Sequence, residues 1–369
     1  MVGNSFTFVC SLKACGNLGA VAFVEEMYHE IIKRGYEKDP FICSTLIAAY
    51  ANCRSFEEAH CVFDRLTVKD SVSWAALVSL YTAYECHEQA VGCLEEIRED
   101  GLFPNAVAYK CILKSCGIGC AIDDGSQVHS DILKEGMERD PLVSIALIEM
   151  YSKFGNFIEA RKLFNSFPGQ TVASWAALIS GYSEHGLNEE ILLCLKEMLT
   201  ENVPPDALIF SLCLKACASL CDIDKGREVH NYIVWDKMET DPYVGTALVE
   251  MYGNFQLITE VQEVFEMLQD PDVVAWTALI AVYAENGHLK EALGYLEQMQ
   301  VKGVSPDDLT FICIMKCSSN LKKVHEGRYI HAGLVKKGLE SYSLVGSSLV
   351  DLYGKSGCLL EAQQVFDKL

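Results

Sequence analysis

Hydrophobic and polar positions alternate along the chain in runs that predict pairs of amphipathic helices. In residues 172–206 apolar side chains recur at helical spacing, a polar segment interrupts them, a second apolar run follows, and two prolines end it. The first run is Trp175, Leu178, Ile179 and Tyr182, and the second is Ile191, Leu192, Leu195 and Met198. Two such short helices cannot bury their apolar faces alone, so neighbouring pairs must stack.

This helix-pair pattern repeats along the whole sequence. Trp74, Trp175 and Trp276 are spaced 101 residues apart, and each period divides into units of 35, 31 and 35 residues. A fixed period is typical of an architecture that grows by adding units. We therefore predict an all-α fold, a right-handed α-solenoid superhelix of stacked helix-turn-helix repeats whose first helices line the concave side. One array would cover residues 1–369, with units 5–39, 40–70, 71–105, 106–140, 141–171, 172–206, 207–241, 242–272, 273–307, 308–342 and a truncated 343–369.

Three of the expected helices have a clearly marked beginning. Asp39, Asp140 and Asp241 each stand directly before a proline. Aspartate is a favoured N-cap residue, and proline is favoured at the first helical position because the N–H that it lacks has no intrahelical partner there. These dipeptides predict helix starts at residues 40, 141 and 242.

Charge and cysteine content restrict the class of protein. The net charge of −21 argues against holding nucleic acid by a bulk positive field, although a local basic track is compatible with it. No apolar run is long enough to span a membrane. The first residues do not have the pattern of a signal peptide or of an Arg/Ser-rich leader, so we expect neither in this sequence. The 17 cysteines include no C-x-x-C pair, which favours reduced thiols in a reducing compartment. Those that recur with the repeat are predicted to be buried: Cys10 and Cys111, and Cys15, Cys116 and Cys217.

The sequence contains no motif for catalysis. It has no phosphate-binding glycine loop, no H-E-x-x-H and no nucleophile elbow. We therefore expect no enzymatic activity, no metal, no cofactor and no small-molecule substrate. The truncated last unit is consistent with a piece of a longer protein.

At this point the sequence resembles the pentatricopeptide repeat family, in particular its subclass with alternating long, short and standard units. The resemblance rests on residues 174–182 for the standard unit, on 247–252 for the short unit and on 214–217 for the long unit. It implies a sequence-specific single-stranded RNA-binding protein of the mitochondrion or chloroplast that reads about one base per repeat. The reading side chains would be the fifth and the last residue of each unit, with apolar neighbours that sandwich the base.

Applied to this chain, the resemblance gives base-reading pairs of three kinds. Thr246 with Asp272, and Thr277 with Asp307, match the combination for guanine. Ser44 with Asp70, and Ser211 with Asp241, resemble a weaker version of the same combination. Ala75 with Asn105, and Ala176 with Asp206, depart from it, as do Val9/Asp39, Lys110/Asp140, Ile145/Thr171 and Ile312/Tyr342. The sequence thus predicts a preference for two adjacent guanines, read by units 242–272 and 273–307.

Several of these residues have two interpretations at this stage. A terminal aspartate can cap the next helix instead of contacting RNA. Lys13, Lys114, Lys215 and Lys316, which share a helix face with the fifth residues, can contact phosphates or pair with an acid of the next unit, such as Glu149, Glu250 or Asp351. The repeated tryptophans, histidines and tyrosines are interpreted as packing residues.

The leading hypothesis is an RNA-binding repeat protein without catalysis of its own, which acts in organellar RNA processing, stabilisation or editing-site recognition. An RNA-processing or editing enzyme acting in trans is the further partner that the resemblance implies; the family's zinc deaminase signature, H-x-E with C-x-x-C, is absent. The alternative hypothesis is an acidic helical-repeat scaffold for protein–protein interaction, which would bind a basic peptide or helix.

Overall fold

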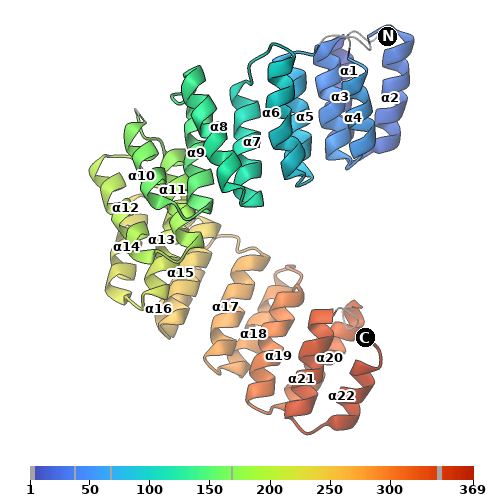
Figure 1. Cartoon of the computed structure of the whole chain (residues 1–369). Helices are drawn as coiled ribbons and strands as arrows, with labels where there is room; N and C mark the ends of the chain where they lie inside the picture. The colour runs from blue at the N-terminus through green and yellow to red at the C-terminus, as the bar shows by residue number, and fades with distance from the viewer. Residues whose placement is uncertain (1–4, 37–38, 67–68, 168, 339–342) are drawn as a thin grey trace. The chain divides into compact units, whose positions relative to one another are not determined.

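The computed structural model describes residues 5–36, 39–66, 69–167, 169–338 and 343–369, and regular structure in these residues is entirely helical. The described chain forms two compact parts, an N-terminal part up to His185 and a C-terminal part from Gly186. The N-terminal part contains α1 (Ser5–Asn17), α2 (Val21–Lys33), α3 (Pro40–Asn52), α4 (Phe56–Asp64), α5 (Ser71–Ala83), α6 (His87–Glu99), α7 (Ala106–Gly119), α8 (Ile122–Glu135), α9 (Pro141–Lys153), α10 (Phe157–Ser166) and α11 (Val172–Glu184) (Figure 1).

The C-terminal part continues in the same way. It contains α12 (Asn188–Thr200), α13 (Ala207–Ser219), α14 (Ile223–Trp235), α15 (Pro242–Asn254), α16 (Ile258–Met267), α17 (Val273–Glu285), α18 (Leu289–Val301), α19 (Asp308–Asn320), α20 (Val324–Lys337), α21 (Ser343–Lys355) and α22 (Leu359–Phe366). No described helix has the length and apolar character needed to cross a membrane.

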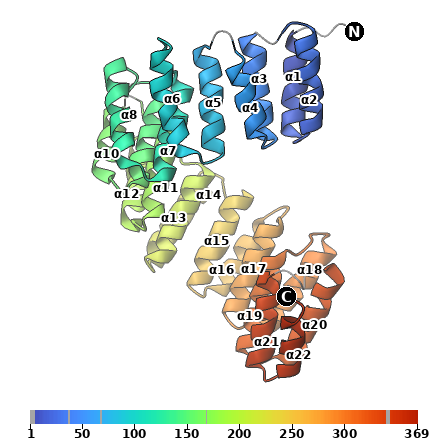
Figure 2. The ribbon, with the colours of Figure 1, turned by 45° about the vertical axis from the view of Figure 1, so that its right-hand side comes forward.

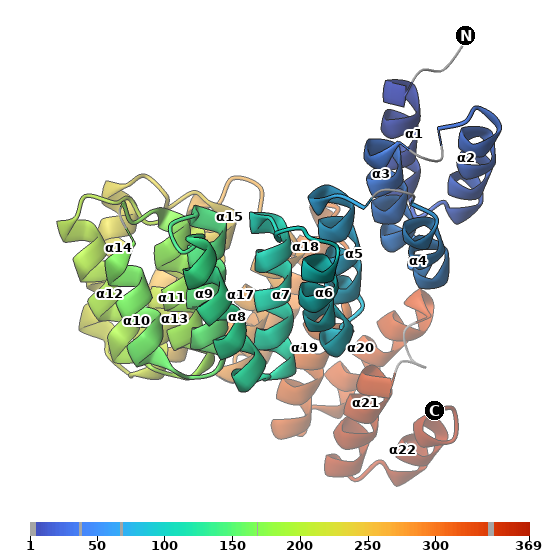
Figure 3. The same cartoon turned by 45° about the horizontal axis from the view of Figure 1, so that its top comes forward.

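Within each part the helices stack as antiparallel pairs (Figures 2 and 3). The odd-numbered helices form a continuous row: α5 packs on α3 and α7, and α17 packs on α15 and α19. Even-numbered helices such as α6, α16 and α18 pack on the first helix of their own pair and on that of the next, as α6 does on α5 and α7. Each pair buries its apolar stripe against its neighbours, so the all-α solenoid fold is confirmed.

Odd-numbered helices begin where a side chain can cap them. Nine residues accept a backbone N–H of the helix that follows: Asp39, Asp70, Asn105, Asp140, Thr171, Asp206, Asp241, Asp272 and Asp307. Each stands at the last position of an expected repeat unit. The predicted helix starts after Asp39, Asp140 and Asp241 are confirmed, with proline in the first turn. Tyr342, the last residue of unit 308–342, lies outside the described residues.

The turn inside each helix pair contains a residue in the left-handed backbone region. In five pairs this residue is glycine: Gly19, Gly155, Gly186, Gly287 and Gly357. In the other six it is Arg54, Glu85, Cys120, Cys221, Gln256 or Lys322, with φ between 52° and 59°. A residue with a Cβ pays a steric penalty in this region that glycine avoids.

Replacing Glu85, at φ 57°, by glycine is therefore expected to stabilise the N-terminal part by about 1 kcal/mol. The equivalent residue one period later is Gly186, which shows that the turn accepts glycine. Denaturant unfolding measures the change. The matched control is Gly287→Ala, at φ 78°, which should destabilise; a loss of stability in Glu85→Gly would contradict the account.

The repeated tryptophans lie in the core, as predicted. Trp74, Trp175 and Trp276 are 1%, 0% and 4% exposed. Each packs edge-on against a phenylalanine of the preceding even-numbered helix, with ring centroids 4.7 Å apart for Phe63–Trp74, 4.4 Å for Phe164–Trp175 and 4.8 Å for Phe265–Trp276. The edge-to-face geometry favours these pairs beyond the area they bury.

The repeated histidines pair with the repeated tyrosines. The ring Nδ1 lies 2.8 Å from the hydroxyl in His129–Tyr151, 2.7 Å in His230–Tyr252 and 2.8 Å in His331–Tyr353. The histidines are half-buried and the tyrosines buried. Burial lowers the pKa of His129 and of His230, and nearby Glu159 and Glu239 oppose this shift.

These histidines give a pH dependence with a definite sign. A histidine whose folded pKa is lowered binds its proton more readily in the unfolded chain, so its contribution to stability is complete above its usual pKa of 6.5 and is lost as the pH falls. Wild-type protein should lose more melting temperature between pH 7.5 and 5.5 than the variant His129→Phe/His230→Phe. The variant is needed as a reference because burial raises the pKa values of Glu149 and Glu250, so these two residues make the folded state more stable as the pH falls. Equal pH slopes would refute the assignment.

All 17 cysteines carry free thiols in the structure. Cys116 and Cys217 are buried as predicted. The prediction is wrong for Cys10, which is exposed, and for Cys15 and Cys111, which are only half-buried. Phe8 and Leu12, one helical turn apart, form the buried stripe of α1. Cys10 lies two residues from each and therefore points to the opposite side of the helix.

Candidate nucleic-acid interface

The odd-numbered helices expose one row of apolar side chains. Ten of the eleven have a large apolar residue at their second position, and all ten are exposed: Phe6, Phe41, Val72, Val107, Leu142, Leu208, Tyr243, Val274, Leu309 and Leu344. The remaining helix, α11, has exposed Ala173 there. We call the surface formed by the second, fifth and ninth residues of these helices the first-helix face. A soluble surface rarely repeats exposed apolar residues in one register unless something covers them.

A hollow of about 420 Å³ opens on the first-helix face of the N-terminal part. Val72 and Val107, the second residues of units 71–105 and 106–140, both line it, together with Ala75 and Asn105, the fifth and last residues of unit 71–105. Ser44 and Lys13 line it as well, with Asn17, Thr45, Ala48, Ala49, Asn52, Ala76 and Ser79. The structure thus gathers predicted base-reading residues and one predicted phosphate contact around a single space.

Thr277 and Asp307 are linked through a third residue. The Thr310 hydroxyl donates to Asp307 Oδ1 at 2.7 Å. Its only proton is then used, so Thr277, whose Oγ1 lies 2.7 Å away, donates to Thr310. The Thr310 backbone N–H also donates to Asp307 Oδ1, at 2.9 Å. These bonds leave the Thr277 lone pairs and Asp307 Oδ2 as acceptors.

Two further hydroxyl readers, Thr246 and Ser44, are also committed as donors. Thr246 donates to the carbonyl of Pro242 at 2.7 Å, and Ser44 donates to that of Phe41 at 3.0 Å. Thr246 is more enclosed than expected for a contact residue, with 8% exposure, whereas Thr277 is half-buried. Both hydroxyls therefore offer acceptors to a ligand.

The last residues use one side of their polar group for capping. Asp272 Oδ1 accepts from Ala275, Asp70 Oδ1 from Ser73, and Asp206 Oδ1 from Ile209, at 2.8–2.9 Å. Asp241 Oδ1 caps α15 in the same way. Capping and ligand contact are thus compatible in one carboxylate, because the bonds involve Oδ1 alone.

Two of the pairs that depart from the guanine combination, Ala75 with Asn105 and Ala176 with Asp206, differ from each other. Asn105 accepts from Ala108 and donates its amide to the carbonyl of Ser71 at 3.0 Å, which fixes its orientation beside buried Ala75. Ala176 is half-buried on α11, and Asp206 is exposed before α13. Ala176 belongs to the N-terminal compact part and Asp206 to the C-terminal one. Half-buried Ser211 lies on α13 in the C-terminal part.

The four repeated lysines are exposed on the first-helix face. Within the described residues, none of them forms an ion pair at 4.0 Å or less. Burial raises the pKa of Glu149, and the charges of Lys110, Lys114 and Lys153 oppose this shift. Burial likewise raises the pKa of Glu250, with Lys215 opposing. Asp351 is bonded instead to Lys355 and Ser319, at 2.9 and 3.1 Å. Glu149 and Glu250 therefore lie near the lysines without forming an ion pair with them. The ammonium groups remain available to an anion.

Two features of this face escaped the sequence analysis. The exposed apolar second residues recur at a fixed position, directly after each unit start. In the helical pattern of the sequence, however, they cannot be distinguished from the apolar residues that are buried. Thr310 links Thr277 to Asp307 across 33 residues, which no local pattern indicates. Only the packing of α17 on α19 brings these hydroxyls together.

Comparison with known proteins gives a consistent family. The model of the PPR repeat family matches residues 271–320, and that of the PPR repeat matches 41–70, 145–169, 173–203 and 347–369. The chain is 31% identical over 368 residues to pentatricopeptide repeat-containing protein At3g09040, mitochondrial, of Arabidopsis thaliana, covering 99% of this chain and 36% of the relative. It is 29% identical to At1g11290, chloroplastic, of the same organism, covering 99% and 45%. The chain thus spans less than half the length of these two relatives.

A solved structure shows the same fold. A cysteine-to-serine variant of the pentatricopeptide repeat protein PPR10, in complex with an 18-nt PSAJ RNA element, superposes with a TM-score of 0.75 at 19% identity, over 99% of this chain and 54% of that one. The family models and the relatives match a chain whose helix pairs recur at alternating lengths and whose tryptophan motif repeats. The chain therefore belongs to the pentatricopeptide repeat family.

Proposed function

We propose that this chain binds single-stranded RNA on its first-helix face, at about one base per repeat and without catalysis of its own. The observation that carries the proposal is the hollow between Val72 and Val107. Two apolar side chains from consecutive units flank it, and the fifth and last residues of one unit line the space between them. A base inserted there would stack between the valines and present its edge to Ala75 and Asn105.

Affinity would come from the exposed lysines. Lys13 lines the hollow, and Lys114, Lys215 and Lys316 take its place in later periods. Contacts to phosphate position a strand without reading its sequence. A few such cations on the first-helix face are compatible with a net charge of −21, because acids elsewhere dominate the total.

Specificity would come from the hydrogen-bonding character of each pair. Thr277 and Asp307 offer acceptors only, since the threonine proton is donated to Thr310. Guanine presents two donors on its Watson–Crick edge, N1–H and the N2 amino group, whereas adenine presents a donor and an acceptor. Thr246 with Asp272 has the same character. We therefore assign two adjacent guanines to units 242–272 and 273–307.

The wider role rests on the family. The mitochondrial and chloroplastic names of the relatives support an organellar protein, and the 35-, 31- and 35-residue spacing of first-helix starts supports the subclass with long, short and standard units. Within that setting the chain would act in RNA processing, stabilisation or editing-site recognition. An RNA-processing or editing enzyme in trans would supply any chemistry, and one array would run through units 5–39 to 343–369.

Fluorescence anisotropy with labelled 12-nucleotide RNAs tests the proposal. An oligonucleotide with a central GG in a uridine background should bind more tightly than its AA counterpart, and affinity should fall as salt rises. Lys114→Gln and Lys215→Gln should weaken both RNAs equally and reduce the salt dependence. Absence of RNA binding at moderate salt, together with binding of a basic peptide, would reject the proposal in favour of an acidic interaction scaffold.

A further inference from the structure

The three phenylalanine–tryptophan pairs are alike in geometry but differ in what covers them. In the first, Lys69 Nζ lies 4.6 Å from the Phe63 ring centroid and 5.2 Å from that of Trp74. In the second, Arg161 Cζ lies 5.6 Å from the Phe164 centroid and 5.9 Å from that of Trp175. A cation thus lies beside each of these two equivalent aromatic pairs, at a distance that favours cation–π attraction. The two cations come from different positions of the repeat.

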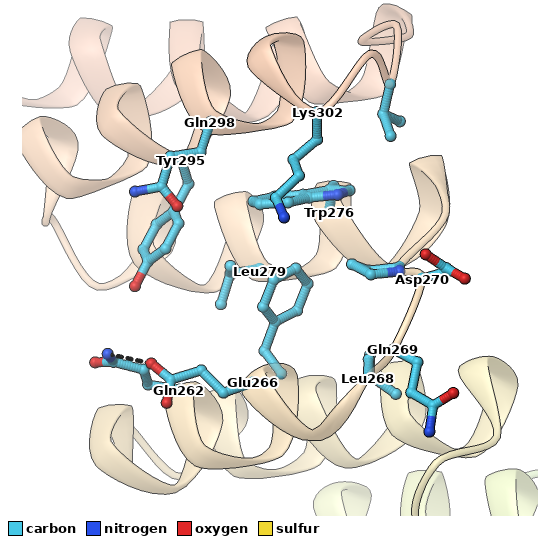
Figure 4. Close-up of a pocket in the computed structure, with 13 residues that line it drawn as sticks. Gln262, Glu266, Leu268, Gln269, Asp270, Trp276, Leu279, Tyr295, Gln298 and Lys302 are labelled. Atoms are coloured by element: carbon cyan, nitrogen blue, oxygen red, sulfur yellow. Dashed lines mark hydrogen bonds between the residues drawn. The ribbon is translucent and has the colours of Figure 1, made fainter.

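The third pair, Phe265 with Trp276, lacks both of these cations. The residue equivalent to Lys69 is Pro271, and the residue equivalent to Arg161 is Gln262. A pocket of about 360 Å³ opens at this pair, and Gln262, Pro271, Phe265 and Trp276 all line it (Figure 4). Neither of the two equivalent positions therefore holds a basic residue here. Trp276 and Phe265 are 4% and 8% exposed, so the pocket reaches a small part of the aromatic pair.

The pocket has features that suit a cation from a binding partner. Tyr295 lines it, where the two earlier periods have Cys93 and Cys194, so a third aromatic ring is present. Glu266 and Asp270 line it as well, and both are exposed. In Figure 4 Tyr295 lies to the left of Trp276, and Glu266 lies below both. Aromatic faces combined with carboxylates are the usual surroundings of a bound ammonium or guanidinium group.

One basic residue, Lys302, also lines the pocket. Its side chain extends from the end of α18 toward Trp276 (Figure 4). Lys302 is exposed and, within the described residues, forms no ion pair at 4.0 Å or less. Its charge opposes an incoming cation, but the two carboxylates outnumber it and its long side chain is free to move aside.

We propose that the pocket between α16, α17 and α18 binds the cationic side chain of a basic peptide segment of a protein partner, arginine or lysine, on the Phe265–Trp276 pair and beside Glu266 and Asp270. The incoming group would take the place that Arg161 occupies within the chain one period earlier. The residues involved are distinct from the first-helix face, so this site is independent of RNA binding.

Fluorine NMR of the whole chain labelled with 5-fluorotryptophan tests this site, with the Trp276 resonance assigned by Trp276→Phe. The probe is an acetylated and amidated Gly-Arg-Gly peptide at about 150 mM salt, where exposed charges are screened. Its titration should shift the Trp276 resonance to saturation and leave that of exposed Trp235 unchanged. The same peptide with citrulline, a neutral isostere of arginine, should bind at least about tenfold more weakly. An equal response to both peptides, or no response, would overturn the proposal.

Three variants make the test specific. Gln262→Arg restores the residue of the preceding period and should abolish peptide binding while the helical circular dichroism is retained. Glu266→Gln should weaken binding and Lys302→Met should strengthen it, each by about threefold, because they change the charge of the lining in opposite directions. A response that survives in Gln262→Arg would place the cation elsewhere. If N-acetylarginine amide saturates the Trp276 resonance and longer arginine peptides do not compete with it, the assignment of the site to a peptide would be overturned.

Discussion

Replacing Asp272 and Asp307 together by asparagine is expected to change the RNA preference from adjacent guanines to adjacent adenines. Each carboxylate offers only acceptors, which suits the N1–H and amino group of guanine. An asparagine amide can keep its oxygen on the capped backbone N–H and direct its NH₂ group toward a base. That group donates to adenine N1, while the threonine oxygen accepts from the adenine amino group.

The expected size of this change follows from base discrimination by paired hydrogen bonds. A good pair is worth about 1–3 kcal/mol against the wrong base, or roughly fivefold to 150-fold per position. Two positions should therefore move the ratio of GG to AA affinities by more than about 20-fold. Anisotropy titrations of the 12-nucleotide RNAs measure the ratio directly. Helix starts should survive, because asparagine caps as well as aspartate does.

Asp206→Asn provides the matched control. Asp206 caps α13 as Asp272 caps α17, but the fifth residue of its unit is Ala176, which offers no hydrogen bond. The control should leave the GG-to-AA ratio unchanged. An unchanged ratio in the double variant would show that these aspartates are capping residues only, and a change of the same size in the control would point to an effect of charge alone.

Local signals were sufficient for the architecture. The fixed 101-residue spacing and the Asp-Pro dipeptides identify helix pairs and their starts without reference to any distant contact. This works because a repeat contacts only its neighbours, so its pattern is written within one period. Cys10 shows the limit: its place in an apolar run suggested burial, but the helical phase relative to Phe8 directs it to solvent.

The candidate site depends on contacts that the sequence does not encode locally. The acceptor character of Thr277 follows from its bond to Thr310, and the hollow beside Asn105 follows from the packing of α3, α5 and α7. Periodicity located the fifth and last residues but could not tell which of their atoms were already bonded. For the same reason the loss of the covering cation at Trp276 becomes meaningful only when the three periods are compared in space.

Replacing Trp175 by alanine is expected to destabilise the N-terminal part by about 3–5 kcal/mol, the usual cost of emptying a buried aromatic site. Trp175 is fully buried, packs on Phe164 and is covered by Arg161. Because repeats stabilise one another only through their interfaces, amide hydrogen exchange should accelerate in α9, α10 and α11 and change little in α1–α3. Uniform acceleration across the N-terminal part would contradict this local account.

The two conservative substitutions Trp175→Phe and Trp74→Phe separate packing from hydrogen bonding. Both remove the same atoms from the same kind of site, but Trp74 Nε1 donates to Asp100 at 3.1 Å, whereas Trp175 Nε1 has no partner within the described residues. Trp74→Phe should therefore cost about 1 kcal/mol more than Trp175→Phe. If the two substitutions lower the free energy of unfolding equally, the hydrogen bond to Asp100 contributes nothing to stability. In either case Trp175→Phe should retain most of the stability that Trp175→Ala loses, because an aromatic ring continues to pack on Phe164.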